Sequence, residues 1–168
     1  VVGSPRYADT DTQRAVRVRN KTSNSFQIKL DNFDGSVTGT TSADWFAMEA
    51  GAWTIEDGGS GTKVIAGTKS DVTTCYSNTY ASTGGELVTF TPNFDAAPAV
   101  IATVATENSS DWMVAHLNDG SARTDEPTVS AMGVGIGRSF ESCLSYSEDI
   151  DYIAVDVGHG TNNGSDFD

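Results

Sequence analysis

The stretch Trp45-Phe46-Ala47-Met48-Glu49-Ala50-Gly51 has a near copy further along the chain. Tyr152-Ile153-Ala154-Val155-Asp156-Val157-Gly158 repeats its order of aromatic, apolar, Ala, apolar, acidic, small or apolar, and Gly. A separation of about a hundred residues between the two copies is the size of one small domain. The repeat therefore predicts two copies of one β unit in tandem.

The composition favours strands and turns over helices. Of 168 residues, 38% are hydrophobic and 20% are charged, while Gly, Ser, Thr, Asn and Asp are abundant. These residues favour turns between short strands, and no run with helical spacing accompanies them. We therefore predict an all-β chain of two antiparallel β-sandwich units.

Individual strands are predicted where apolar and polar residues alternate. Val16-Arg17-Val18-Arg19 is the clearest such run, with one face buried and one facing water. The strand at 45–49 is expected to be largely buried, with Trp45 in the core. The Gly-interrupted run at 129–136 is expected to bend or bulge, and 159–168 to form a loose polar tail. Further strands are predicted at 26–30, 63–67, 86–91, 100–105, 112–117, 140–144 and 152–157.

The glycine-rich segment 58–61 is the predicted boundary, giving a first unit at 1–58 and a second at 59–168. Val1–Ser4 aligns with Val100–Thr103, but the second unit has an extra strand, 87–91, before this point. The first unit therefore lacks an opening strand, and the open edge would attract a strand from another subunit. The alternative is that the chain, which begins at Val1 without Met, is a fragment or a processed product.

Phe90…Phe94…Pro98-Ala99-Val100-Ile101, followed by Phe140 and Tyr152-Ile153-Ala154, resembles the H-type lectin domain. Residues 16–20, Phe26 and 45–49 are similar to the tandem lectin-like repeats of bacterial and phage surface proteins. The resemblance implies a six-stranded antiparallel sandwich that assembles as trimers or stacked trimers. It rests on framework positions and identifies no sugar-contacting residue.

The net charge of −13 argues against nucleic acid and anionic membranes as partners, because both would repel the chain. It fits a soluble extracellular protein. No apolar run is long enough to cross a membrane, so no membrane insertion is expected.

We expect no enzymatic activity. The two histidines, His116 and His159, lie in an apolar strand and in the tail, and neither a G-x-S-x-G nor an H-E-x-x-H pattern occurs. The many carboxylates leave glycoside hydrolysis as the enzymatic alternative.

Calcium is the predicted cofactor, if any, because several loops are rich in the hard oxygen ligands that it prefers. The alternative for each loop is a solvated acidic turn, and none has the full EF-hand pattern. The candidate ligands are Asp9, Asp11, Asp31, Asp34, Asp119, Asp149 and Asp151.

Glycan binding requires an exposed aromatic ring and nearby polar groups. Trp53 and Trp112 are the candidate rings, and Arg17 and Arg19 share one face of a strand and are candidate polar contacts. The alternative is that Trp packs between sheets and Arg pairs with the plentiful acids. Cys75 and Cys143 form either one disulfide or two separate buried thiols.

Together these patterns predict a non-enzymatic structural or adhesive subunit of an extracellular fibre or virion surface assembly, joined by strand donation. Its first partner is another copy of itself, in a homo-oligomer or polymer. The alternative is a lectin that recognises cell-surface glycans. Both place the protein outside the cell, at a cell or virion surface.

Overall fold

The computed structural model describes residues 1–6, 14–32, 42–56, 61–73, 86–110, 112–118, 127–138, 146–157, 160–162 and 165–167. All regular structure in these residues is β-strand, as the composition predicted, and none of them forms a helix that could cross a membrane. The strands are β1 (Val2–Arg6), β2 (Arg14–Arg19), β3 (Gln27–Asn32), β4 (Ser42–Phe46), β5 (Gly51–Ile55), β6 (Thr62–Val72), β7 (Glu86–Thr89), β8 (Ala99–Val104), β9 (Met113–Asn118), β10 (Ala131–Arg138), β11 (Glu148–Val155), β12 (Gly160–Asn162) and β13 (Ser165–Phe167).

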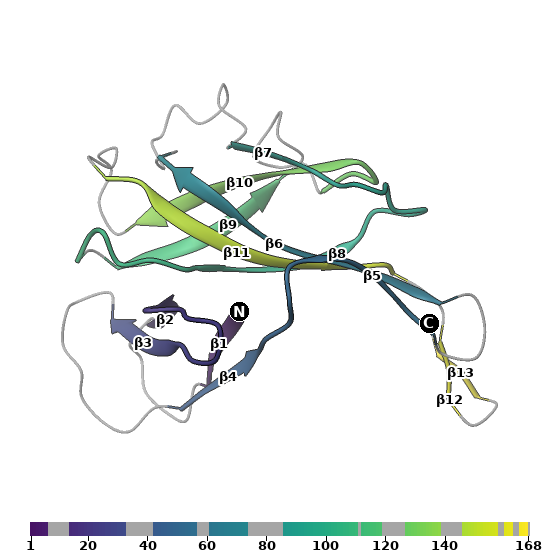
Figure 1. The fold of residues 1–168 in the computed structure, drawn as a ribbon, viewed down its shortest axis with the longest axis horizontal. Helices are drawn as coiled ribbons and strands as arrows, with labels where there is room; N and C mark the ends of the chain where they lie inside the picture. The colour runs from purple at the N-terminus through teal and green to yellow at the C-terminus, as the bar shows by residue number, and fades with distance from the viewer. Residues whose placement is uncertain are drawn as a thin grey trace.

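Two sheets form a sandwich. One has the order β7-β10-β9, and it packs on the β8-β11-β6 part of a six-stranded sheet with the order β3-β2-β8-β11-β6-β5. The strands β2 and β3 join the larger sheet through a single parallel bridge between Arg17 and Val104. They lie with the β1-β4 ribbon in a layer beneath the sandwich (Figure 1).

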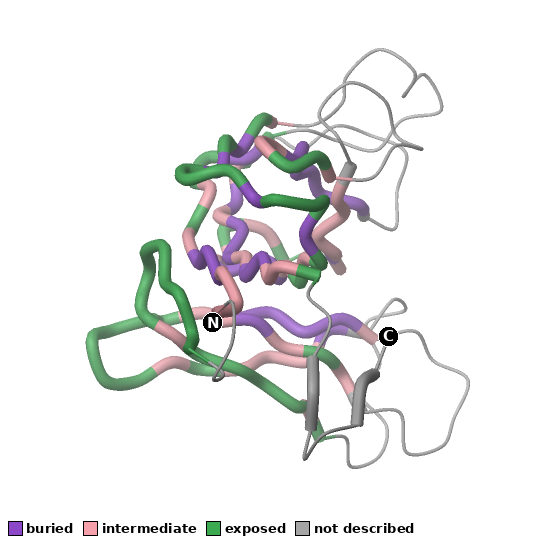
Figure 2. Tube along the Cα trace, turned by 90° about the vertical axis from the view of Figure 1, so that its right-hand side faces the viewer, coloured by how far each residue is buried: buried purple, intermediate pink, exposed green. Residues whose placement is uncertain are grey.

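The main hydrophobic core lies between the two sheets. It contains alternate residues of β10 and β11, because successive side chains of a strand point to opposite faces. Buried residues surround the interior of the sandwich, and a further buried stretch lies in the layer below it (Figure 2). Fully buried side chains of this core include Val72, Val104, Met113, Met132, Val134, Ile136 and Ile150.

The strand β10 is regular and not bulged, contrary to the expectation for its glycines. Gly133 to Arg138 pair with β9 in continuous register. Gly135 faces His116 so closely that a Cβ atom would overlap the imidazole ring. The glycine is therefore needed for the packing of His116 and does not interrupt the strand.

The strand β11 is the centre of the six-stranded sheet and is covered on both faces. Its partners are β6 and β8. On the face turned away from the sandwich core, here the outer face, Ile153 packs with Val64, Ala66 and with Val2 of β1. The layer beneath the sandwich is thus attached through a second, smaller core.

The two copies of the repeated stretch lie in unlike environments. Tyr152 to Val155 belong to the central strand β11, whereas β4 ends at Phe46 in a two-stranded ribbon. The prediction that 45–49 is buried with Trp45 in the core is wrong, since Trp45 and Phe46 are each 57% exposed. The tail predicted to be loose contains the two paired strands β12 and β13.

Strands from both predicted units share one sheet. β5, before the glycine-rich boundary, pairs with β6, after it. The strand β1 has β4 on one side, and the backbone N–H and C=O of Gly3 bond to the Thr103 hydroxyl at 2.9 and 3.2 Å. At Gly3, the groups on both sides of the first strand are therefore supplied by this chain, while the division into two units stays a prediction.

Candidate functional site

A cleft of about 820 Å³ lies where the lower layer meets the outer face of the sheet. Its walls are the β2–β3 turn (residues 21–26), Trp45 of β4 and the segment that follows β4 (residues 47–50). Its floor is formed by residues 66–68 of β6 and 151–153 of β11. We call it the N-terminal cleft.

A buried carboxylate marks the polar end of the cleft. The Asp151 side chain is only 4% exposed. Its Oδ1 accepts hydrogen bonds from Lys21 Nζ at 2.7 Å and from Thr68 Oγ1 at 2.6 Å. Its Oδ2 accepts one from the Val1 nitrogen at 3.0 Å. Charge-assisted bonds of this kind hold a carboxylate in one orientation, so Asp151 is a fixed acceptor.

Two aromatic rings mark the other end. Phe26 and Trp45 meet edge to face, with centroids 5.0 Å apart and an interplanar angle of 75°. This arrangement is favourable for aromatic pairs and leaves part of the indole open to solvent. The ring is thereby oriented by Phe26 without being buried by it.

The turn between the two ends is rigid and polar. Thr22 N–H donates to the Ser25 carbonyl at 2.8 Å, and Thr22 Oγ1 accepts from the Ser25 N–H at 3.0 Å. Such bonds from a hydroxyl to the local backbone stabilise a tight turn. The exposed Ser23 and Asn24 are thus held at the rim of the cleft.

Behind the floor, on the core side of the same sheet, lies the phenol of Tyr152. A Cβ atom at Gly67 would lie 2.6 Å from the Tyr152 hydroxyl, so the tyrosine ring occupies the space that a side chain on β6 would fill. Burial raises the pKa of Tyr152 above its usual value. The phenol therefore stays neutral in ordinary conditions.

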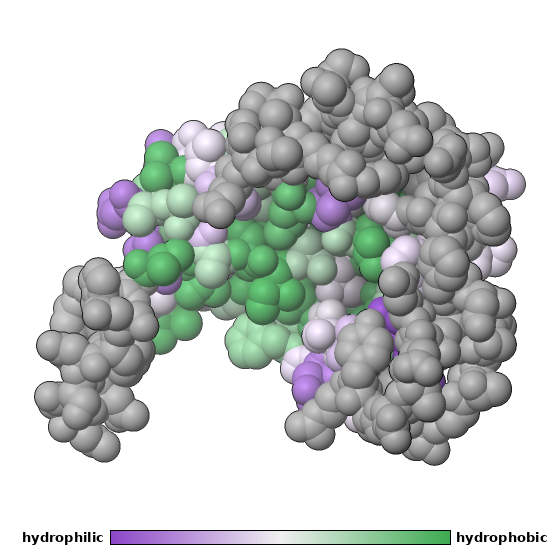
Figure 3. Space-filling view, turned by 180° about the vertical axis from the view of Figure 1, so that it is seen from behind, coloured by the Kyte–Doolittle hydropathy of each residue, from purple (hydrophilic) through white to green (hydrophobic). Residues whose placement is uncertain are grey.

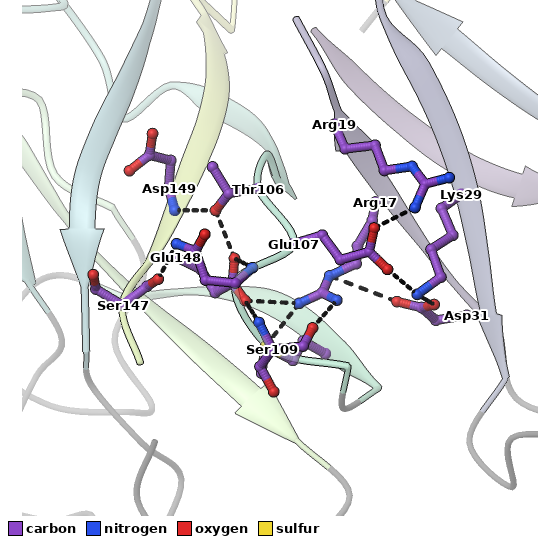
Figure 4. A network of polar contacts seen from close by, with 12 residues as sticks. Arg17, Arg19, Lys29, Asp31, Thr106, Glu107, Ser109, Ser147, Glu148 and Asp149 are labelled. Atoms are coloured by element: carbon purple, nitrogen blue, oxygen red, sulfur yellow. Dashed lines mark hydrogen bonds and ion pairs between the residues drawn. The ribbon is translucent and has the colours of Figure 1, made fainter. Parts of the chain in front are cut away.

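A buried ion pair anchors the hairpin that forms one wall of the cleft. Arg17 Nη2 donates to Glu148 Oε1 at 3.0 Å, and Arg17 Nη1 donates to the Ser109 carbonyl at 2.6 Å (Figure 4). Neither Arg17 nor Glu148 has any exposed side-chain surface. Asp31 Oδ2 lies 3.5 Å from Arg17 Nε. We call these residues the Arg17 network.

Glu148 is also the acceptor for the loop after β8. Its Oε2 accepts from the Thr106 hydroxyl at 2.6 Å and from the Asn108 N–H at 3.1 Å, and its Oε1 accepts from the Ser109 N–H at 2.8 Å. A buried carboxylate needs such partners, since its desolvation is otherwise costly. One side chain thus orders residues 106–109 and holds Arg17.

A second acid lies nearer the surface of the same region. Glu107 accepts hydrogen bonds from Lys29 and Arg19 (Figure 4), and these bonds lower the pKa of Glu107 to about 2. Burial by itself would lower the pKa of Lys29, but its bonds to Glu107 and Asp31 raise it overall. The β2–β3 hairpin is therefore held by ion pairs that its basic residues, Arg19 and Lys29, form with Glu107.

None of the predicted glycan contacts lines the cleft, although Trp53 bonds to a residue of its wall. Trp53 lies on β5, 42% exposed, and its Nε1 donates to the Glu49 carbonyl at 3.2 Å. Trp112 is half-buried just before β9. Arg17 and Arg19 do share one face of β2, but both pair with acids, which is the alternative the sequence left open.

The described candidate calcium ligands already have partners. Asp31 lies 2.9 Å from Lys29 Nζ, Asp149 Oδ1 accepts from the Asp71 N–H at 3.1 Å, and Asp151 is bound as described above. Among the described residues, no group of three His, Cys, Asp or Glu side chains could hold a metal ion. The other predicted residues, Asp9, Asp11, Asp34, Asp119, Cys75 and Cys143, lie outside the described part of the chain.

Sequence reasoning missed Lys21, Phe26, Trp45 and Thr68 as residues of a site. The repeat had assigned Trp45 and Phe26 to the framework of the fold. A signal was present in the hydroxyl- and amide-rich run 22–25 directly before Phe26. No model of a known protein family matches this chain, and no characterised protein or solved structure matches it. The geometry of the cleft therefore carries the functional argument.

Proposed function

We propose that this chain is a non-enzymatic adhesive domain of an extracellular or virion surface, and that it binds carbohydrate in the N-terminal cleft. One observation carries the proposal: an exposed indole, Trp45, faces the same cleft as a fixed carboxylate, Asp151. A sugar has an apolar C–H face and a polar edge of hydroxyl groups. A site with one aromatic ring and a few convergent polar groups suits both.

Each part of the cleft has a role in this binding. The C–H face of the sugar lies on Trp45, and its hydroxyl groups donate to Asp151 and accept from Lys21. Ser23 and Asn24 at the rim contact further hydroxyls. Because the turn and the carboxylate are already held by internal bonds, little entropy is lost on binding.

The negative net charge of the chain favours neutral sugars over anionic sugars as the ligand. With a net charge of −13, the protein repels polyanionic glycans over long distances. A single open cleft binds weakly, and adhesion then depends on several copies acting together. Multivalent display on a fibre or virion meets that need and agrees with the lectin resemblance of the sequence.

The second candidate is a purely structural fibre subunit, favoured by an apolar surface at the start of β8. Ile101 is 59% exposed. Its neighbour in sequence, Val100, lines a separate apolar groove of about 250 Å³ together with residues such as Leu117 and Val157. Hydrophobic residues gather in the middle of the rear view (Figure 3). Exposed apolar patches of this kind mark protein contacts.

A glycan array followed by titration calorimetry tests sugar binding. We expect Trp45→Ala to weaken the affinity for the best neutral glycan at least ~10-fold. Tyr146→Ala is the matched control, because it removes an exposed aromatic ring outside the cleft, and it should leave the affinity unchanged. An array without hits would contradict the proposal, as would equal losses in the two variants.

The second candidate, a structural fibre subunit, is tested by measuring assembly instead of sugar affinity. Ile101→Lys should reduce light scattering from large assemblies without changing sugar affinity, since it lies outside the cleft. Assembly that this variant leaves intact, together with lost sugar binding in Trp45→Ala, would leave carbohydrate recognition as the function.

A further inference from the structure

The strand β5 is an open edge of the six-stranded sheet. It pairs with β6 from Gly51↔Ala66 to Ile55↔Thr62, and among the described residues no strand pairs with its other side. All five of its residues are exposed, including Trp53 at 42% and Ile55 at 53%. Its outer N–H and C=O groups are therefore placed to bond with another strand.

The two edges of this sheet differ in how they are protected. The opposite edge, β3, carries Lys29 and Asp31, and charges on an edge strand discourage pairing with another chain. β5 has neither a charged residue nor a proline, and it contains one aromatic and two β-branched residues, which favour strands. Only one of the two edges thus has the usual protection.

We propose that two copies of the chain pair through β5, antiparallel and about a two-fold axis at Trp53. This register sets Trp53 opposite the partner subunit's Trp53, and Gly51 opposite the partner subunit's Ile55. It joins the two six-stranded sheets into one continuous sheet. The proposal goes beyond carbohydrate binding and does not depend on it, although it would supply the multivalency that weak sugar binding requires.

The strand is complementary to itself, which is why a second copy is the favoured partner. In the antiparallel register a large side chain meets a large one at the centre, and a glycine meets an isoleucine at each end. A two-fold contact needs this property, because each residue must suit the position that its own symmetry mate occupies. Aromatic pairs opposite one another stabilise antiparallel strands.

The distribution of charge on the chain also favours a second copy as the partner of β5. Two copies with a net charge of −13 repel over most of their surface, but β5 brings ten uncharged residues together, five from each copy. The nearest acids along the chain, Glu49 and Glu56, lie beyond the ends of the paired segment. Association is therefore expected to strengthen as salt screens the remaining repulsion.

The outer face adds apolar contact to the backbone pairing. Trp53 lies opposite Val64 in the β5–β6 pair and so shares its face. Val64 belongs to the small core beneath the sheet. Pairing through β5 places the partner subunit's Trp53 beside this apolar row and covers the exposed indole.

Sedimentation of the full chain without sugar tests the pairing. We expect a weak reversible dimer, as suits a contact of this limited size, with a higher dimer fraction at higher protein concentration and in high salt. Thr54→Lys should weaken dimerisation at least ~10-fold, because it sets two new charges into the strand pair. Thr89→Lys is the matched control, since it makes the same change at an exposed position of the edge strand β7.

A cross-linking experiment fixes the register independently of folding effects. The two copies of residue 53 face each other on the axis, so Trp53→Cys should form a disulfide dimer under mild oxidation. Ile55→Cys, two residues along the same strand, should not, because its symmetry mate lies too far away. A chain that stays monomeric throughout, a dimer unaffected by Thr54→Lys, or equal cross-linking at both positions would overturn the proposal.

Discussion

Arg17 and Glu148 meet at 3.0 Å although neither side chain has exposed surface and 131 residues separate them in sequence. The pair joins the β2–β3 hairpin to the start of β11. A buried ion pair is tolerated only when its remaining polar atoms have partners, and Glu148 accepts three further hydrogen bonds. The contact therefore specifies where the hairpin sits on the sandwich and, through residues 21–26, one wall of the cleft.

Breaking this pair from one side should be costly. We expect Arg17→Met to lower the free energy of unfolding by about 3–5 kcal/mol, because it leaves the Glu148 carboxylate buried without its cation. Urea unfolding followed by circular dichroism measures the change. The double variant Arg17→Met/Glu148→Gln should recover part of the loss, since neither charge remains. Arg19→Gln, at a half-exposed position, is the control and should cost about 1 kcal/mol or less.

Stability should fall in acid because of Glu107. Its pKa is about 2 in the folded protein against about 4.5 for a free side chain. A carboxyl with a lowered folded pKa stabilises the protein above its unfolded pKa, and this contribution is lost as pH falls. We therefore expect part of the unfolding free energy, about 1 kcal/mol, to disappear between about pH 5 and 2. Glu107→Gln should flatten this portion of the pH profile, and an unchanged profile would refute the assignment.

Gly135 should tolerate no side chain while His116 is present. A Cβ at this position overlaps the imidazole ring, so Gly135→Ala should destabilise the protein by about 1–3 kcal/mol, the usual cost of overpacking. Thermal unfolding measures the effect. Adding His116→Ala to Gly135→Ala should restore part of the stability. A loss that is the same with and without His116 would show that backbone effects, and not the ring, require the glycine.

The Asp151 carboxylate should matter more for binding than its neighbour Thr68. Asp151→Asn removes the charge that holds Lys21, so we expect at least a ~10-fold loss of affinity for the best neutral glycan in titration calorimetry. Thr68→Ser keeps the hydroxyl that donates to Asp151 and should bind as the wild type does. Similar losses in both variants would point to a general disturbance of the floor.

The sequence predicted the class of fold and several strands because period-two alternation is a local signal. The run Val16 to Arg19 places both arginines on one face, but the expectation that this face meets water is wrong, because Arg17 has no exposed side-chain surface. The exposure of Trp45 could not be predicted, because the same pattern of residues occurs in the two-stranded ribbon and in the central strand β11. What differs is the number of neighbouring strands, and those come from distant parts of the chain.

The cleft could not be predicted from the sequence either, because its residues come from distant parts of the chain. Its polar end combines Lys21, Thr68 and Asp151, which lie on three strands or turns that only the sheet order brings together. Each of these residues is ordinary in its local context. Asp151 was singled out as a metal ligand from its acidic neighbours, whereas its observed partners are a lysine, a hydroxyl and a backbone nitrogen.

The central position of β11 governs the order in which the protein can fold. Its neighbours β6 and β8 pair with it and not with each other, so the middle of the sheet is missing until residues 148–155 have been synthesised. The strands synthesised earlier have unpaired edges until then, and contacts between residues far apart in sequence form slowly. We therefore expect the sheet to fold only after β11 has been synthesised. The yield of folded protein then depends on protecting the unpaired edges of the earlier strands until that point.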